Sequence, residues 1–133
     1  MSQPRSSYAF TKLVVDDLEK MAAFYSQVYG LREVARVQER IAGAAIDEIM
    51  LGVGADMSSG SLVLLNFVDA PPPRNGEVIL GFTTDDLPAL LERVRAAGGG
   101  VHDAIRQMPE MKIQVAFATD PEGHLAELVQ LLP

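Results

Sequence analysis

Few side chains in this sequence are of a type that could carry catalysis or hold a metal ion. Its 133 residues include two histidines, His102 and His124, and no cysteine. The lack of cysteine excludes disulfides, thiolate zinc sites and cysteine nucleophiles. The polar stretch Ser58–Ser61 has no histidine placed beside it, so nothing points to a serine nucleophile. The chemistry left to the chain is that of its carboxylates, its lysines and two imidazoles.

The overall composition narrows the class of partner. The formal net charge of −7 argues against nucleic acid, for which a basic face is expected, and favours a neutral or cationic small ligand. No run approaches the roughly 18 consecutive apolar residues that a membrane span needs. The polar segment 1–8 lacks a signal-peptide pattern. We therefore expect a cytoplasmic protein that has neither a membrane nor nucleic acid as its partner.

The chain repeats itself once. Leu13–Leu18 (LVVDDL) resembles Phe82–Leu87 (FTTDDL) at an offset of 69 residues, and at the same offset Gly30 falls on Gly99. Each copy runs from a strand-like segment through Asp-Asp-Leu into a helical pattern and then to glycine. Two copies are too few for a solenoid, so the repeat predicts a domain built from paired modules.

The order of elements follows from these patterns. One helix is expected to begin at Asp16 or Asp17 and end at Gly30, and a second to begin at Asp85 or Asp86 and end at Gly98–Gly100. The order is then β-α-β-β-β in each of two modules, about 8–68 and 77–132, joined by a proline-rich linker at 69–76 within one domain of residues 1–133. The expected strands are Phe10–Val15, Arg32–Gln38, Ala45–Val53, Ser61–Phe67, Val78–Thr83, a short one near Val101–Ile105, Ile113–Thr119 and His124–Leu131.

Three stretches carry a family resemblance, and together they span nearly the whole chain. They are Val15–Lys20 with Phe24-Tyr25 and Gly30-Leu31, Asp85–Leu87 with Ala97–Gly99, and Asp120–His124 with Glu127-Leu128. In this order they resemble the glyoxalase/bleomycin-resistance/dioxygenase superfamily, also called the vicinal oxygen chelate superfamily. The resemblance implies an α+β fold, in which two βαβββ modules form a cupped mixed sheet around a ligand site, and it implies a homodimer.

The resemblance also implies where metal ligands would stand. In metal-dependent members four ligands come from equivalent inward positions, which here hold Phe10, Ile79, Val63 (or Leu65 if the register slips by two) and Glu127. Only Glu127 carries a donor atom, and one carboxylate cannot make a divalent metal site. We therefore expect no cofactor and no divalent metal.

Two charged residues are the candidates for chemistry in such a cup. Glu127 could act as a general base or bind a cationic ligand, or it could be a salt-bridged or solvated relic. Lys12 lies two residues after Phe10 and should share its inward face. It could pair with Glu127 in the space that a metal would occupy, meet an anionic substrate group, or extend to the rim of the cup.

Two classes of function fit this pattern. The first is a small-molecule binder without metal, like the bleomycin-resistance branch, with Phe10, Lys12, Val63, Leu65, Ile79 and Glu127 around a largely apolar or cationic ligand. Alternatively, the apolar members of this set fill the cup completely. The second class is an enzyme of the lyase, isomerase or dioxygenase type, which uses an atypical metal site or acid–base chemistry by Glu127 and Lys12.

Overall fold

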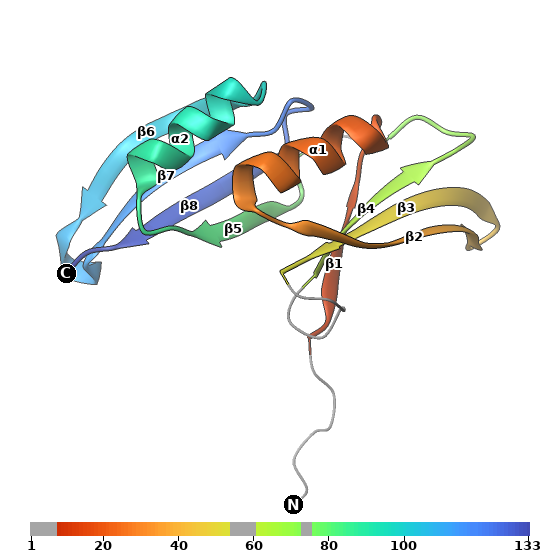
Figure 1. The fold of residues 1–133 in the computed structure, drawn as a ribbon, viewed down its shortest axis with the longest axis horizontal. Helices are drawn as coiled ribbons and strands as arrows, with labels where there is room; N and C mark the ends of the chain where they lie inside the picture. The colour runs from red at the N-terminus through yellow and green to blue at the C-terminus, as the bar shows by residue number, and fades with distance from the viewer. Residues whose placement is uncertain (1–7, 54–60, 73–75) are drawn as a thin grey trace, which may run out of the picture.

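The computed structural model describes residues 8–53, 61–72 and 76–133, and it contains the two expected βαβββ modules in sequence order (Figure 1). The linker residues 73–75 and the polar residues 58–60 lie outside the described ranges. The first module consists of β1 (Phe10–Val14), α1 (Leu18–Tyr29), β2 (Arg32–Ile41), β3 (Ala44–Gly52) and β4 (Ser61–Phe67). The second consists of β5 (Ile79–Thr83), α2 (Leu87–Ala96), β6 (Gly100–Met108), a 3-10 turn (Pro109–Met111), β7 (Ile113–Thr119) and β8 (Leu125–Leu131).

Each module folds its four strands into a sheet of its own. The strand orders are β1-β4-β3-β2 and β5-β8-β7-β6. In both sheets the first strand of the module runs parallel to the last, and the remaining neighbours are antiparallel. The expected α+β architecture is therefore confirmed. Two strands are longer than expected. β2 extends to Ile41 because it pairs with β3 as far as Ala44, and β6 extends to Met108 because it pairs with β7 as far as Ile113.

The helix boundaries follow from local chemistry. The side chain of Asp17 accepts a hydrogen bond from the backbone N–H of Lys20 at 3.1 Å, and that of Asp86 accepts one from Ala89 at 3.1 Å. Such N-caps satisfy amides that have no partner within the helix. Gly30 ends α1 with φ +72°, a conformation that glycine adopts without strain. Both predicted helix starts are thus confirmed.

One hydrophobic core joins the two modules. Both helices lie on the same side of the two sheets (Figure 1), and their buried faces meet in a single cluster. The strands contribute every second residue to this cluster, for example Leu13, Ile49 and Leu64 in the first sheet and Leu128 in the second. The side of each sheet that faces away from the helices is called its open face below. The sequence places Phe10, Lys12, Glu48, Val63 and Leu65 on the first open face and Ile79 and Glu127 on the second, since these residues alternate with the core positions.

Candidate functional site

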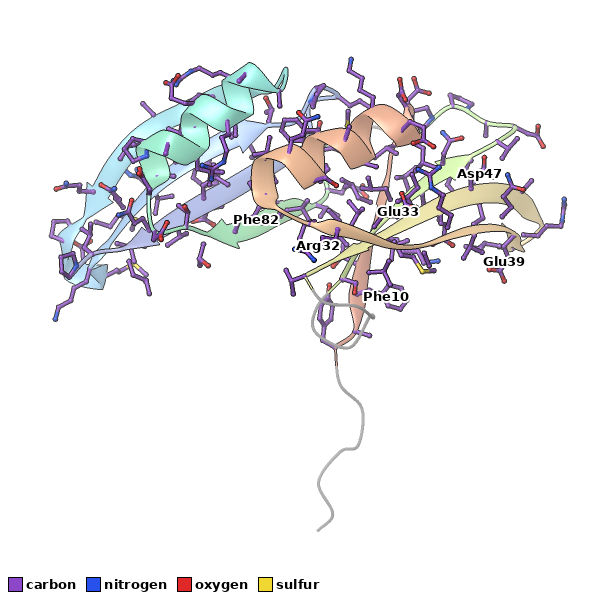
Figure 2. All side chains as sticks on the ribbon, in the orientation of Figure 1. Phe10, Arg32, Glu33, Glu39, Asp47 and Phe82 are labelled. Carbon is purple, nitrogen blue, oxygen red and sulfur yellow. The ribbon has the colours of Figure 1, made fainter. Side chains whose placement is uncertain are left out.

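The expected binding residues of the first module lie close together on the first open face. Phe10 and Lys12 are on β1, and Val63 and Leu65 are on the neighbouring strand β4. Phe10 projects from this face and is 42% exposed (Figure 2). Val63 and Leu65 are only 0% and 4% exposed, so they pack within the face and have almost no surface to offer to solvent.

Lys12 forms an ion pair with a residue that sequence reasoning missed. Its Nζ donates a hydrogen bond to Oε1 of Glu48 on β3 at 3.0 Å. The expected pairing of Lys12 with Glu127 is therefore wrong. Since β4 lies between β1 and β3, a long lysine side chain can reach across one strand to Glu48, whereas Glu127 belongs to the other sheet.

The Glu48 carboxylate is unusual in its burial. The residue is 2% exposed, and the face neighbours Ile46 and Leu65 are also buried. Lys12 satisfies one carboxylate oxygen, but Oε2 has no hydrogen-bond partner. A buried acceptor without a partner costs on the order of 1–3 kcal/mol, and more when it is charged. This carboxylate therefore has an unused binding capacity on the first open face.

Two further residues, Phe10 and Ser61, lie beside the Lys12–Glu48 pair on the first open face. The Lys12 Nζ lies 5.8 Å from the centroid of the Phe10 ring, within the range of a cation–π contact. Ser61 pairs with Phe10 in the β1–β4 register, is 7% exposed, and its hydroxyl has no hydrogen-bond partner. Two buried polar atoms of the described residues, Glu48 Oε2 and Ser61 Oγ, thus lie unpaired on one face of one sheet.

A pocket of about 320 Å³ separates the edges of the two sheets. Thr11 and Ser61 line it from the first module, while Ile79, Leu80 and Phe82 line it from β5. Ser61 is the residue of this pocket that carries an unpaired buried hydroxyl. The pocket is therefore apolar over much of its wall, with one polar group available to a ligand.

The expected residues of the second module lie on the other open face. Ile79 is 56% exposed on the edge strand β5, and Glu127 is half-buried on β8 opposite Gly81 and Phe117. Across the described part of the chain, no side-chain hydrogen bond or ion pair forms at Glu127. The structure thus places Phe10 and Lys12 together on one sheet and Ile79 and Glu127 together on the other.

The positions expected from the motifs to hold metal ligands offer one donor side chain. Phe10, Val63 and Ile79 have no lone pair, and Glu127 alone could coordinate an ion. Within residues 8–53, 61–72 and 76–133, no group of three or more His, Asp or Glu side chains is arranged to hold a metal ion. The residues at these positions do not fit the usual divalent metal.

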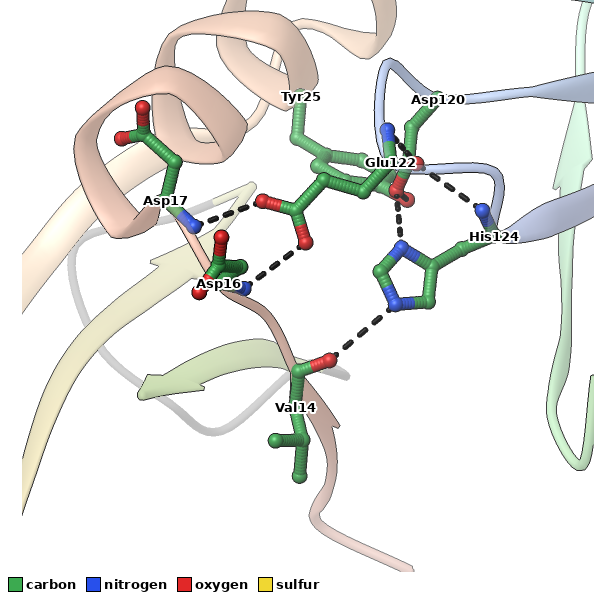
Figure 3. Close-up of polar contacts among 7 residues, drawn as sticks. All are labelled: Val14, Asp16, Asp17, Tyr25, Asp120, Glu122 and His124. Atoms are coloured by element: carbon green, nitrogen blue, oxygen red, sulfur yellow. Dashed lines mark hydrogen bonds and ion pairs between the residues drawn. The ribbon is translucent and has the colours of Figure 1, made fainter. Parts of the chain in front are cut away.

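His124 takes part in a buried network that joins the two modules (Figure 3). The ring contacts Asp120 through Nδ1 at 2.8 Å and the backbone carbonyl of Val14 through Nε2 at 3.2 Å. The Tyr25 hydroxyl donates to Asp120 at 2.8 Å, and the Glu122 carboxylate accepts two backbone N–H groups just before α1. His124 is 7% exposed, and its contact with Val14 anchors the Asp120–His124 turn to the first module.

The protonation states in this network depend on one another. The hydrogen bond to Asp120 raises the pKa of His124 above its ordinary value of 6.5. Burial alone would raise the pKa of Asp120, but the hydrogen bonds from His124 and Tyr25 outweigh it and lower that pKa below 3.8. Burial beside the Asp120 carboxylate raises the pKa of Tyr25, which stays a neutral donor. The network is a buried structural ion pair whose contacts join the two modules.

The comparison with known families agrees with the fold and the motifs. The sequence model of the Glyoxalase/Bleomycin resistance protein/Dioxygenase superfamily matches residues 7–128, and the chain belongs to this superfamily. A probable lactoylglutathione lyase of Vibrio cholerae is 31% identical over 126 residues, which cover 90% of this chain and 87% of the relative. The resemblance drawn from the motifs is thereby confirmed.

Solved structures show the same architecture at low sequence identity. A glyoxalase family protein from Bacillus cereus superposes with a TM-score of 0.82 at 16% identity, covering 99% of this chain and 100% of that one. Glyoxalase I from Zea mays superposes with a TM-score of 0.75 at 22% identity. The match covers 92% of this chain but only 45% of the maize protein, so this chain spans about half of that enzyme's length.

Proposed function

We propose that this chain binds a small, largely apolar or cationic molecule on the open faces of its sheets, without the usual divalent metal. The observation that carries the proposal is the set of residues at the four ligand positions. Phe10, Val63 and Ile79 replace donors by hydrocarbon, which removes coordination, and the exposed Phe10 and Ile79 side chains add apolar contact surface. Glu127, half-buried and without a partner in the described structure, is available to a cationic group of the ligand.

We further propose that the binding form is a homodimer. Phe10 at 42%, Ile79 at 56% and Leu131 at 71% exposure are large apolar side chains on the open faces or the edge strand β5. A second copy laid on these faces would remove them from water and would close the site from above. In such a dimer the ligand is enclosed between two chains.

The alternative is an enzyme, and the similarity to a probable lactoylglutathione lyase of Vibrio cholerae favours it. In this chain a lyase or isomerase would need either metal ligands at atypical positions or acid–base work by Glu127. Lys12 would act beside Glu48 in such an enzyme, since its ion pair is made there. Each of these two routes to catalysis needs more precisely placed polar groups than ligand binding does.

One experiment separates the two proposals. Purified protein would be analysed for Ni, Zn, Fe and Mn before and after incubation with each metal, and a panel of apolar and cationic aromatic compounds would then be screened by calorimetry. We expect less than one tenth of a metal ion per chain and binding of some compounds without turnover. Stoichiometric metal that is held through gel filtration would overturn the metal-free proposal in favour of the enzyme.

A further inference from the structure

The two sheets differ at positions that the repeat makes equivalent. Lys12 is opposite Val63 in the first sheet, as Gly81 is opposite Glu127 in the second. Since β4 and β8 correspond in this way, Glu48, opposite Leu65, corresponds to Val115, opposite Val129. The fold is therefore built in the second module without any ion pair at these two positions.

An ion pair that the fold does not require needs another explanation. Replacing a buried ion pair by hydrocarbon of similar size is often neutral or stabilising, so burial of Glu48 is not by itself favourable. The free-energy cost of burying Glu48 is greater here because Oε2 has no hydrogen-bond partner, although the residue is only 2% exposed. The Lys12 side chain is 34% exposed, so its ammonium can meet a ligand from solvent while it stays within reach of Glu48.

From this arrangement we infer that Lys12 and Glu48 bind a neutral polar group that carries a hydrogen-bond donor beside an acceptor, as a primary carboxamide does. Glu48 Oε2 accepts the ligand's N–H, and Lys12, with three N–H donors and one used on Glu48, donates to the ligand's carbonyl. This inference rests on the proposed use of the open faces as a ligand site, and it names the chemical group that the first open face would bind.

The charges of the pair select against charged groups at this point. A cation that approached Oε2 would come close to the Lys12 ammonium, and an anion that approached Lys12 would come close to the Glu48 carboxylate. A neutral group meets neither repulsion. The Phe10 ring beside Nζ adds a flat apolar surface, so an aromatic carboxamide matches both features of the site.

Benzamide is the probe that tests this inference, with acetophenone as the isostere that has the carbonyl but no N–H donor. Titration calorimetry on the full chain should give an affinity for benzamide about tenfold higher than for acetophenone, the effect of one buried hydrogen bond. Benzoate and benzamidine, which carry a negative and a positive charge on the same ring, should both bind more weakly than benzamide.

Variants of Glu48 test whether this residue causes the preference for benzamide. Glu48→Gln should abolish the preference for benzamide, whereas Asp47→Asn, the same change one residue earlier on the opposite side of β3, should retain it. Should Glu48→Gln fail to fold, the apolar double variant Lys12→Met/Glu48→Leu replaces it, and it should bind benzamide and acetophenone equally. Thermal unfolding of each variant reports on folding separately from binding.

The outcomes distinguish this inference from the proposed function. Equal binding of benzamide and acetophenone by the wild type, tighter binding of benzamidine than benzamide, or a preference that survives in both Glu48 variants would each overturn the inference while apolar binding stands. If no aromatic compound binds, the proposed function fails and the inference fails with it.

Discussion

The two open faces of this molecule are built on the same backbone plan and carry different chemistry. The first has the Lys12–Glu48 pair and two unpaired buried oxygens, while the second has hydrocarbon or glycine at the positions of that pair and carries the Glu127 carboxylate on β8. The features that form the modules, by contrast, are shared, since each helix has an aspartate N-cap that accepts from the third residue of its helix. The difference teaches that the repeat fixes the scaffold and leaves the faces free to diverge.

A substitution in the buried contact between the modules should cause the largest loss of stability. Asp120→Ala removes a carboxylate that accepts from Tyr25, from His124 and from the backbone N–H of Glu122. We expect a loss of about 4 kcal/mol, because several buried donors lose their acceptor at once. Asp103→Ala, which breaks the exposed His102–Asp103 pair, is the matched control and should change the free energy of unfolding by less than about 0.5 kcal/mol. Urea denaturation measures both; similar losses would contradict a special role for the buried pair.

Removing one partner of the first-face pair should be the next largest effect. Lys12→Met leaves Glu48 buried without any partner, and we expect about 3 kcal/mol of destabilisation. The double variant Lys12→Met/Glu48→Leu gives the first face the apolar character of the second, so it should be at least as stable as the wild type. Chemical denaturation of the three proteins tests this order. A double variant less stable than the wild type would show that the pair itself stabilises the fold.

The buried Asp120–His124 pair should also set a pH window for stability. The pKa of His124 is raised in the folded state, so its contribution is full below the ordinary value of 6.5 and is lost as the pH rises through the folded value. The pKa of Asp120 is lowered, so its contribution is present above 3.8 and is lost as the pH falls through the folded value. Stability should therefore peak between these limits. Unfolding followed from pH 3 to 9 should show a weaker alkaline decline in His124→Gln, while His102→Gln keeps the wild-type profile.

Loss of an aspartate N-cap should have the smallest effect on stability, and the effect should be similar in the two modules. Asp17→Ala and Asp86→Ala each remove one N-cap hydrogen bond of 3.1 Å, and we expect a loss of about 1 kcal/mol in each case. Thermal unfolding of the two single variants measures the difference. A loss in one module twice that in the other would mean that the shared scaffold is not equivalent in the two copies.

Local signals predicted the scaffold well. The Asp-Asp-Leu repeat located both helix starts, and Gly30 located the end of α1, because caps and left-handed turns depend on residues within a few positions of each other. The second helix ends at Ala96, two residues before the expected glycines. Gly99 is restricted in another way, by packing against a distant strand: a Cβ there would lie 2.4 Å from the carbonyl oxygen of Thr119 on β7. Element order and fold class were therefore available from the sequence.

The ion-pair partners of the charged residues could not be predicted from the sequence. Lys12 and Glu48 are 36 residues apart, and their contact depends on β4 being inserted between β1 and β3. A glutamate that alternates with Ile46 and Met50 on one strand was a signal for a buried carboxylate, but the sequence did not say which cation would meet it. The pairing of His124 with Asp120 was likewise hidden, since a four-residue spacing within a turn has no fixed geometry.

The parallel pairing of β1 with β4 has a consequence for the order of folding. Phe10 pairs with Ser61 and Ile79 with Leu125, so each sheet is completed only by joining segments 51 and 46 residues apart. The β2-β3-β4 and β6-β7-β8 meanders involve shorter loops and can assemble earlier, because short loops cost less entropy to close. We expect β1 and β5 to be the late-docking strands. The edge where the two sheets approach, which holds the pocket and Phe10, is then the last part of the molecule to take shape and the first to open.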